Sequence, residues 1–339
     1  MKEIDTYLWI HSNDYAVLLN QENYQFMEIH AINESELAVR KLFSEMMLTT
    51  KEEAQLKVCL VGFHHIAEHI LKNIISLLQA QNRTIKIILL QEDVVNQSAV
   101  FFNQNPEIAK VAEFSFVEKK ENTKEYFLYL EELISSLDYV FYVNQNLTAL
   151  TELYRLKQRN CAKTKICCYF AEKPEYEKML STKPFAWIHF FGNWQELYQD
   201  ERRWEDISLF EKQSNRALAL SIQTKLQGIG LCYKVGTSIA LYEEKIKEKE
   251  LLLQLTKEEH LRWNAFYFSN GWRTLALDLK NPVNKKAVTK EHICLVSFEE
   301  LITIGEVFGK DYQEADRHLM INLGKVLQQA GFGIEKLKS

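Results

Sequence analysis

The stretch Val58-Cys59-Leu60-Val61-Gly62-Phe63-His64-His65 has the pattern of a buried strand that ends in a tight turn. From Lys57 to Phe191, similar runs of five or six apolar residues alternate with amphipathic segments. This alternation is typical of a parallel sheet that helices cover on both faces. The pattern predicts an α/β fold with a doubly wound, mostly parallel, Rossmann-like sheet.

The same patterns predict the elements of the sheet and of the segment before it. Strands are expected at residues 58–62, 85–90, 112–117, 139–143, 166–170 and 187–191. The helices of this region are expected at 65–79, 95–103, 124–135, 147–158 and 174–180. Upstream, the expected elements are strands at 7–11, 16–19 and 26–32 and a helix at 34–47. We interpret residues 1–54 as a small α/β lead-in docked on a Rossmann-like domain of residues 55–200.

After Gly192 the chain becomes helical and charged, and residues 201–339 are interpreted as a helical linker followed by a mainly helical second domain. Helices are expected at 194–210, 208–227 and 311–329. Thr256-Lys257-Glu258-Glu259 has the pattern of a capping box, so a helix is expected to begin at Thr256 and to end at Asn270-Gly271. Ser297-Phe298-Glu299-Glu300 predicts a second capping box.

Length and charge limit the classes of function. A chain of 339 residues exceeds what one hydrophobic core usually serves, so two domains are expected. A net charge of −5 provides no basic field for a duplex nucleic acid. No apolar run approaches the roughly 20 residues of a membrane span, and Met1-Lys2-Glu3-Ile4-Asp5 does not begin a signal peptide. We expect no membrane insertion and a cytoplasmic location.

Cysteine and histidine spacing does not predict a metal site. The six cysteines form no C-x-x-C pair, and most of them lie in apolar, strand-like surroundings. His65 and His69 have i,i+4 spacing, but no carboxylate completes an H-E-x-x-H pattern.

The turn after the first strand of the predicted sheet is the candidate cofactor site. Gly62 can supply the tight bend, but His64 stands where a second glycine would bring the backbone close to a pyrophosphate. Glu92 and Asp93, at the end of the next strand, are candidate ribose ligands. The candidate cofactor-binding residues are Gly62, His64, His65 and Glu92. Two interpretations remain open: a site for NAD or another nucleotide, and a Rossmann scaffold that holds no cofactor.

The stretch Glu259-His260-Leu261-Arg262-Trp263-Asn264-Ala265, followed by Gly271-Trp272, is the second candidate site. An indole can stack on a planar ligand, a guanidinium can hold a phosphate, and an amide can bind a base edge. In the alternative interpretation, Trp263 and Trp272 are core residues and Arg262 pairs with an acid such as Glu258. The residues alone do not decide between these two.

Two resemblances bear on this choice. Residues 56–170 resemble a TrkA N-terminal (RCK-type) Rossmann domain. A second set of motifs resembles the RyR domain, named after the ryanodine receptor. These motifs are Glu-His-x-Arg-Trp-Asn-Ala, the later Gly-Trp, the stretch Lys290–Leu301 and the pairs Asp311-Tyr312 and Asp316-Arg317. The chain is therefore similar to bacterial fusions of these two domains, and the similarity covers most of residues 56–330.

The resemblance to the RyR domain implies a ligand pocket. Carried over residue by residue, its candidate members are His260, Arg262, Trp263, Asn264, Trp272, Lys286, His292, Asp316 and Arg317. Lys285 and Lys286 lie on the intervening loop and can close over an anion, although a solvated pair of lysines is the commoner meaning of such a run. Ser214-Asn215-Arg216 has two open interpretations, as part of a pocket or as part of an interdomain contact.

These resemblances imply a non-catalytic ligand sensor. The RyR domain would bind a small, nucleotide-derived molecule in a bacterial defence or signalling system, and the chain is expected to form a homodimer that acts on a separate effector. One alternative is an enzyme that uses NAD or another nucleotide at the Gly62 turn. The other is a regulatory subunit of a separate cation channel or transporter.

Overall fold

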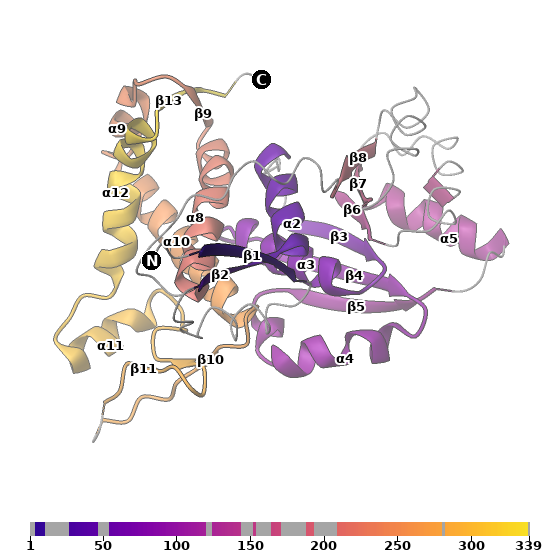
Figure 1. The fold of residues 1–339 in the computed structure, drawn as a ribbon. Helices are drawn as coiled ribbons and strands as arrows, with labels where there is room; N and C mark the ends of the chain where they lie inside the picture. Colours follow the sequence, from indigo (N-terminus) through magenta and orange to yellow (C-terminus); the bar gives the residue numbers. More distant parts are fainter. Residues whose placement is uncertain are drawn as a thin grey trace.

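A computed structural model describes most of the chain (Figure 1). The described residues are 4–10, 27–46, 54–119, 124–143, 152–153, 164–170, 188–192, 209–279 and 282–337. The strand expected at 16–19 and the helix expected at 174–180 lie outside these residues, as does most of the helices expected at 147–158 and 194–210.

A six-stranded, all-parallel sheet forms the larger half of the molecule, and the expected strands are confirmed. The strands are β3 (Gln55–Val61), β4 (Thr84–Gln91), β5 (Glu113–Glu118), β6 (Tyr139–Tyr142), β7 (Lys165–Tyr169) and β8 (Ile188–Phe191). Their order across the sheet is β5-β4-β3-β6-β7-β8, which is the Rossmann-like order, with the direction of winding reversing between β3 and β6.

Alternate residues of each strand enter two different cores, one on each face of the sheet. Val58 and Leu60 of β3 pack with α3 (His65–Leu77) and α4 (Val94–Gln104), while Cys59 and Val61 pack with α5 (Lys124–Ser135). This is why β3 is apolar at every position from Val58 to Val61 instead of at every second one. The expected helices at 65–79, 95–103 and 124–135 are confirmed, and a short 3-10 helix, η1 (Ile108–Lys110), follows α4.

The N-terminal segment consists of β1 (Ile4–Ile10) and β2 (Met27–Asn33), which form a separate two-stranded parallel sheet, and α2 (Glu34–Glu45). Buried side chains of α2, among them Leu42 and Phe43, belong to the same core as α3 and the sheet. Hydrophobic burial therefore joins α2 to the sheet.

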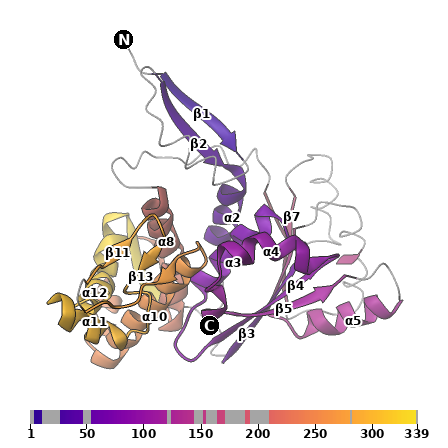
Figure 2. The same ribbon diagram turned by 90° about the horizontal axis from the view of Figure 1, so that it is seen from below.

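The C-terminal half is mainly helical and lies beside the sheet (Figure 2). Its helices are α8 (Leu209–Gly228), α9 (Ala240–Lys245), α10 (Lys249–Phe268), α11 (Glu300–Phe308) and α12 (Gln313–Gln329). Two small sheets accompany them. One pairs β9 (Leu231–Val235) with β13 (Phe332–Lys336), and the other has the order β10 (Arg273–Thr274), β12 (Glu291–His292), β11 (Lys285–Lys286).

The start of α10 corrects the sequence prediction. The helix begins at Lys249, not at Thr256, and the hydroxyl of Thr256 donates to Leu252 O at 2.7 Å within the helix. Leu252 and Leu255 pack in the core formed by α8, α9 and α12, so burial extends the helix upstream past the local capping signal. The second capping box is confirmed, because Ser297 N donates to Glu300 Oε2 at 2.8 Å and Glu300 N donates to Ser297 Oγ at 3.3 Å.

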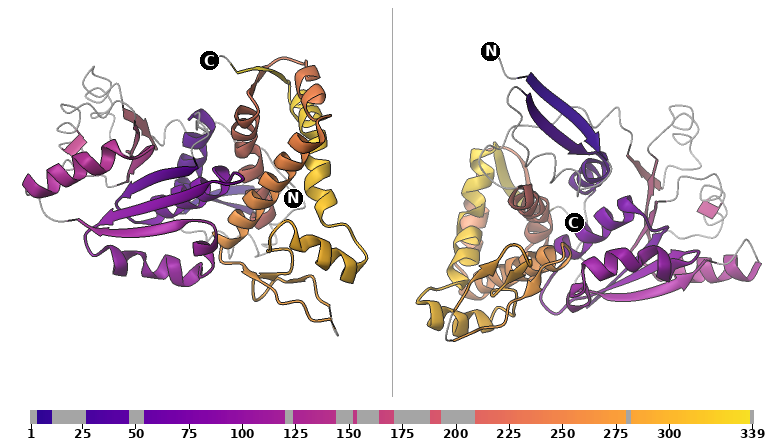
Figure 3. Two further views of the ribbon diagram at one scale, coloured as in Figure 1. Left: turned by 180° about the vertical axis from the view of Figure 1, so that it is seen from behind. Right: turned by 60° about the horizontal axis from the view of Figure 1, so that its bottom comes forward.

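Helix α10 connects the two halves of the molecule (Figure 3). It lies against α3, α8 and α12. Ala265 belongs to the core of α3 and the sheet, whereas Leu255 belongs to the core of the C-terminal helices. Gly271, just after α10, lies against the end of α4 in a left-handed conformation with φ of 81°.

Replacement of Gly271 by alanine is expected to destabilise the protein by at least about 2 kcal/mol. The added Cβ would lie 2.7 Å from Gln104 O, in addition to the strain at positive φ. Gly309→Ala is the matched control, since Gly309 has φ of 63° but a Cβ added there would meet no atom within 4 Å, so it should cost only about 1 kcal/mol. Urea unfolding of both variants measures the difference, and equal losses would contradict close contact at Gly271.

Candidate functional site

The Gly62 turn has the tight bend that the sequence predicts. Gly62 has φ of 98°, a conformation that favours glycine, and its N–H donates to Leu90 O at 2.9 Å. The turn therefore leads from β3 directly into α3, at the edge where the winding of the sheet reverses.

His64 links this turn to the end of β6. Its Nε2 lies 2.7 Å from Val143 O, at the end of β6, and its Nδ1 accepts from Ile66 N at 3.4 Å. Phe63 N donates to Gln91 Oε1 at 2.9 Å. Two backbone N–H groups of the turn, which in a dinucleotide site are available to a pyrophosphate, are thus bonded to side chains of the chain itself.

The other candidate cofactor residues lie on the surface around the turn. His65 and Glu92 are exposed. Burial lowers the pKa of His64, opposed by its contact with Val143 O, so its ring is neutral near pH 7. No group of three His, Cys, Asp or Glu residues in the described part of the chain is arranged to hold a metal ion.

A buried ion group lies in the middle of α10. Arg262 Nε and Nη2 donate to the two carboxylate oxygens of Glu259 at 2.9 and 2.7 Å, and Lys225 Nζ of α8 lies 3.3 Å from Glu259 Oε2. Glu259 and Arg262 are only 1% and 2% exposed. The Arg262 guanidinium is therefore engaged inside the protein, and its partner is Glu259 at i−3 instead of Glu258 at i−4.

The two cations beside Glu259 determine its pKa. Burial alone would raise the pKa of Glu259, but the Arg262 and Lys225 cations and their hydrogen bonds lower it below its ordinary value. Because the folded-state pKa is depressed, the stabilisation from the Glu259 carboxylate is present at neutral pH and is lost as pH falls below about 4.5.

His260 and Asn264 occupy the next face of α10. His260 Nδ1 lies 3.2 Å from Asp316 Oδ2 of α12, and its Nε2 lies 2.9 Å from Val296 O. Asn264 Nδ2 donates to the same carbonyl at 2.7 Å. These side chains tie α10 to α12 and to the loop before α11.

The two tryptophans have different surroundings. Trp272 is 5% exposed, and its ring lies 5.4 Å from that of Phe210 and 5.0 Å from that of Tyr267. Trp263 is partly exposed, with its ring 4.2 Å from Tyr267 and 5.1 Å from His292. Trp272 is thus a core residue, whereas Trp263 presents part of its indole at the surface.

The small sheet beside α10 brings Lys285 to this aromatic group. Lys285 of β11 is paired with His292 of β12, and its Nζ lies 5.1 Å from the Trp272 ring centre. Lys286 is exposed, and its Nζ lies 4.0 Å from Glu291 Oε2. His292 Nδ1 accepts from Cys294 N at 3.1 Å, so a neutral ring carries its proton on Nε2.

Arg317 has its contacts at the start of α12. Its guanidinium pairs with Glu314 and lies 3.3 Å from Asp311 Oδ2. The structure therefore brings Trp263, His292 and Lys285 together. Trp263 also packs on His260, which contacts Asp316. Arg317 has different partners and does not join this group. We call the partly exposed group of Trp263, His292 and Lys285 the indole site. Lys286, the next residue on β11, is paired with Glu291 and lies on the other face of the strand.

Sequence analysis missed Lys225 as the partner of Glu259. Part of the signal was local, because Lys225 lies beside Ile222 and Leu226, whose spacing marks the buried face of α8, but no local pattern identifies its partner on another helix. A lysine on such a face is expected to have an acidic partner.

Glu259→Gln is expected to lower the free energy of unfolding by about 3–5 kcal/mol, because Lys225 and Arg262 would remain buried without a carboxylate. Glu306→Gln on the exposed side of α11 is the control and should change stability by less than about 0.5 kcal/mol. Urea unfolding at pH 7 measures both. A loss at Glu259 no larger than at Glu306 would contradict the buried ion group.

His292 is expected to make the protein sensitive to acid. Burial, reinforced by repulsion from Lys285, lowers the pKa of His292 from 6.5 to about 4. The neutral ring contributes its full stability above pH 6.5, and this contribution is lost as pH falls from 6.5 to about 4. In thermal melts over this range, His292→Gln should lose less stability than wild type. If the melting temperatures of the two proteins change in parallel with pH, the pKa of His292 is not lowered.

Comparison of the chain with family models, with curated proteins and with solved structures found no match. In the described residues, no helix has the length and apolarity that a bilayer crossing requires. The assignment of the two halves to TrkA-type and RyR-type domains therefore rests on the residues quoted for the resemblance.

Proposed function

We propose that the protein is a non-catalytic ligand sensor whose helical, RyR-type half binds a small, nucleotide-derived anion at the indole site. The observation that carries the proposal is the perpendicular pair of Trp263 and His292 rings, 5.1 Å apart and both partly exposed, with a lysine on the paired strand. This group combines a stacking surface with positive charge.

Each member of the indole site has a separate role in recognition. The exposed part of the Trp263 indole offers aromatic surface to a base, while the rest of the ring contacts Tyr267 and His260. Lys285 is an exposed cation that can approach a phosphate. His292, neutral with its proton on Nε2, can donate one hydrogen bond without adding charge.

The indole site is held in place from within the protein. Trp263 stacks on His260 with ring centres 6.0 Å apart, and His260 contacts Asp316 and Val296 O. The Glu259 ion group fixes the preceding turn of α10 against α8. A ligand would therefore meet a preformed surface, which reduces the conformational entropy lost on binding.

Helix α10 links the indole site to the core of the sheet. The helix that carries Trp263 also places Ala265 in the core of α3 and the sheet. A ligand that binds two arrangements of α10 with different affinity would shift their populations. The resemblance to TrkA-type and RyR-type fusions supports a homodimer that transmits this shift to a separate effector in a bacterial defence or signalling system.

Calorimetry with a panel of linear and cyclic nucleotides tests the proposal. For a nucleotide that binds wild type, Trp263→Ala should weaken binding by about 1–3 kcal/mol through loss of stacking. Lys285→Ala should weaken it about tenfold, or about 1.4 kcal/mol. The matched control is Lys325→Ala, an exposed lysine near the far end of α12, which should bind as wild type does.

Two results would contradict the proposal. Equal affinity of wild type, the Trp263 variant and the lysine variant for every bound nucleotide would show that nucleotides do not bind at the indole site. Turnover of a bound nucleotide by the purified protein would show an enzyme in place of a sensor. Circular dichroism of each variant establishes that a loss of binding does not come from unfolding.

A further inference from the structure

Helix α4 contains no charged residue along its whole length. Its 11 residues read Val-Val-Asn-Gln-Ser-Ala-Val-Phe-Phe-Asn-Gln. Charged residues make up 26% of the chain, and a helix at the surface normally carries them on its solvent-facing side. The exposed face of α4 thus differs in composition from that of an ordinary surface helix.

Only one face of α4 is buried against the protein. Val94, Ser98 and Phe101 are buried, whereas Val95 and Val100 are 63% and 65% exposed. Figure 1 shows α4 along the outer side of the sheet-bearing half. Single exposed apolar residues are ordinary on a protein surface, but two valines on one uncharged helix form part of a larger patch.

This apolar surface continues from α4 onto β5, which is an edge strand of the sheet. The Phe102 ring of α4 lies 5.0 Å from the Phe114 ring and 5.3 Å from the Phe116 ring of β5. Phe116 is 43% exposed, and Phe102 is partly exposed. We call the exposed face of α4, together with Phe102 and Phe116, the α4 patch.

The polar side chains of the α4 patch are amides. Asn96 donates to Asp93 Oδ1 at 2.7 Å, and Gln97, Asn103 and Gln104 are exposed on the same helix. A side-chain amide both donates and accepts hydrogen bonds, so it can bond to the same group of an identical chain. In a two-fold contact, a residue near the axis meets its own copy, and a charged residue there would meet its own charge. A face of amides and apolar side chains is therefore suited to a second copy of the chain.

The charges around α4 also favour a second copy. The chain has a net charge of −5, so two copies repel each other in most orientations. Glu92, Asp93 and Glu118 are exposed at the N-terminal end of α4. An antiparallel pair of α4 helices would keep these acidic ends about 16 Å apart, since each helical residue advances about 1.5 Å. A partner of opposite charge would find no charged group on α4 to select it.

We propose that two copies of the chain associate through the α4 patch, with the two α4 helices packed antiparallel about a two-fold axis. The inference rests on the proposed function for the homodimer, whose surface it names. Burial of Val95, Val100 and Phe116 would stabilise the contact, and the amides would hydrogen-bond around them. Gly271, just after the helix that carries Trp263, lies against the end of α4, so the dimer contact adjoins the end of α10.

Sedimentation velocity of the full chain over a wide range of concentrations tests this surface. Wild type is expected to pass from monomer to dimer as the concentration rises. Val95→Glu combined with Val100→Glu should weaken association at least about tenfold, because the new carboxylates would face their own copies. Ile302→Glu is the matched control, since Ile302 of α11 is 57% exposed and lies outside the α4 patch, and it should associate as wild type does.

A charge swap at the middle of α4 tests the two-fold arrangement. Val100 follows Ala99, the central residue of the helix. Val100→Glu chains and Val100→Lys chains should each associate weakly alone. An equal mixture of the two should form dimers more tightly than either one, because opposite charges then meet across the axis.

A wild-type chain that stays monomeric at every concentration would overturn the proposal, as would equal association of wild type and the Val95 and Val100 variant, or no gain on mixing. Circular dichroism of each variant checks that it is folded. Nucleotide calorimetry on the same samples separates this contact from the indole site. A monomer that binds a nucleotide through Trp263 overturns the α4 contact alone. A dimer that the Val95 and Val100 changes break, but that binds no nucleotide, supports the α4 contact and overturns the indole site alone.

Discussion

The carboxylate of Glu259, held between Arg262 on the same helix and Lys225 on α8, is the interaction on which the arrangement of the helical half depends. All three side chains are buried, and the cost of removing a charge from water is recovered only when its partners are in place. The ion group therefore selects one rotation of α10 against α8. That rotation turns Ala265 toward the sheet and leaves part of the Trp263 ring at the surface.

Helix α10 has polar side chains on several buried faces, which distinguishes it from an amphipathic surface helix. Thr256, Glu259, His260, Arg262 and Asn264 are all buried. Each has a polar contact on the same helix or a neighbouring element, as with His260 and Asp316 or Asn264 and Val296 O. Buried polar contacts are directional, so they specify which helices meet and in what register, whereas apolar contacts alone allow sliding. These contacts fix the geometry of the indole site.

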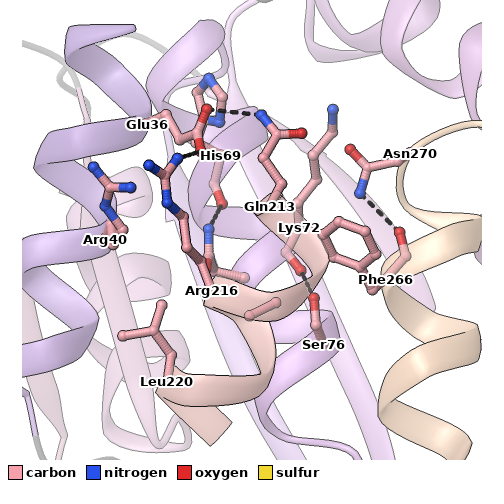
Figure 4. Close-up of a pocket in the computed structure, with 12 residues that line it drawn as sticks. Glu36, Arg40, His69, Lys72, Ser76, Gln213, Arg216, Leu220, Phe266 and Asn270 are labelled. Atoms are coloured by element: carbon pink, nitrogen blue, oxygen red, sulfur yellow. Dashed lines mark hydrogen bonds and ion pairs between the residues drawn. The ribbon is translucent and has the colours of Figure 1, made fainter. Parts of the chain in front are cut away.

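The sheet could be predicted from sequence because its signal is local. Every residue of β3 from Val58 to Val61 is apolar, and the structure shows why, since alternate residues enter opposite cores. The start of α10 was predicted wrongly because the local capping pattern at Thr256 is outweighed by burial of Leu252 and Leu255 against helices distant in sequence. The second cation beside Glu259 was missed for the same reason, as Lys225 lies on another helix. The cavity where α2, α3, α8 and the end of α10 meet (Figure 4) draws on four helices, and no local pattern predicts their meeting.

The Gly62 turn keeps the bend of a phosphate turn, but the chain itself occupies two of its backbone donors. His64 and Gln91 accept from N–H groups that a phosphate turn offers to a ligand. An anion at the turn would also have to displace the neutral imidazole of His64 from its 2.7 Å contact with Val143 O, which would leave that carbonyl without this partner. On this physical ground, the Rossmann-like sheet would serve here as a support for the helices packed on it, and the proposed ligand is placed on the helical half instead of at the turn.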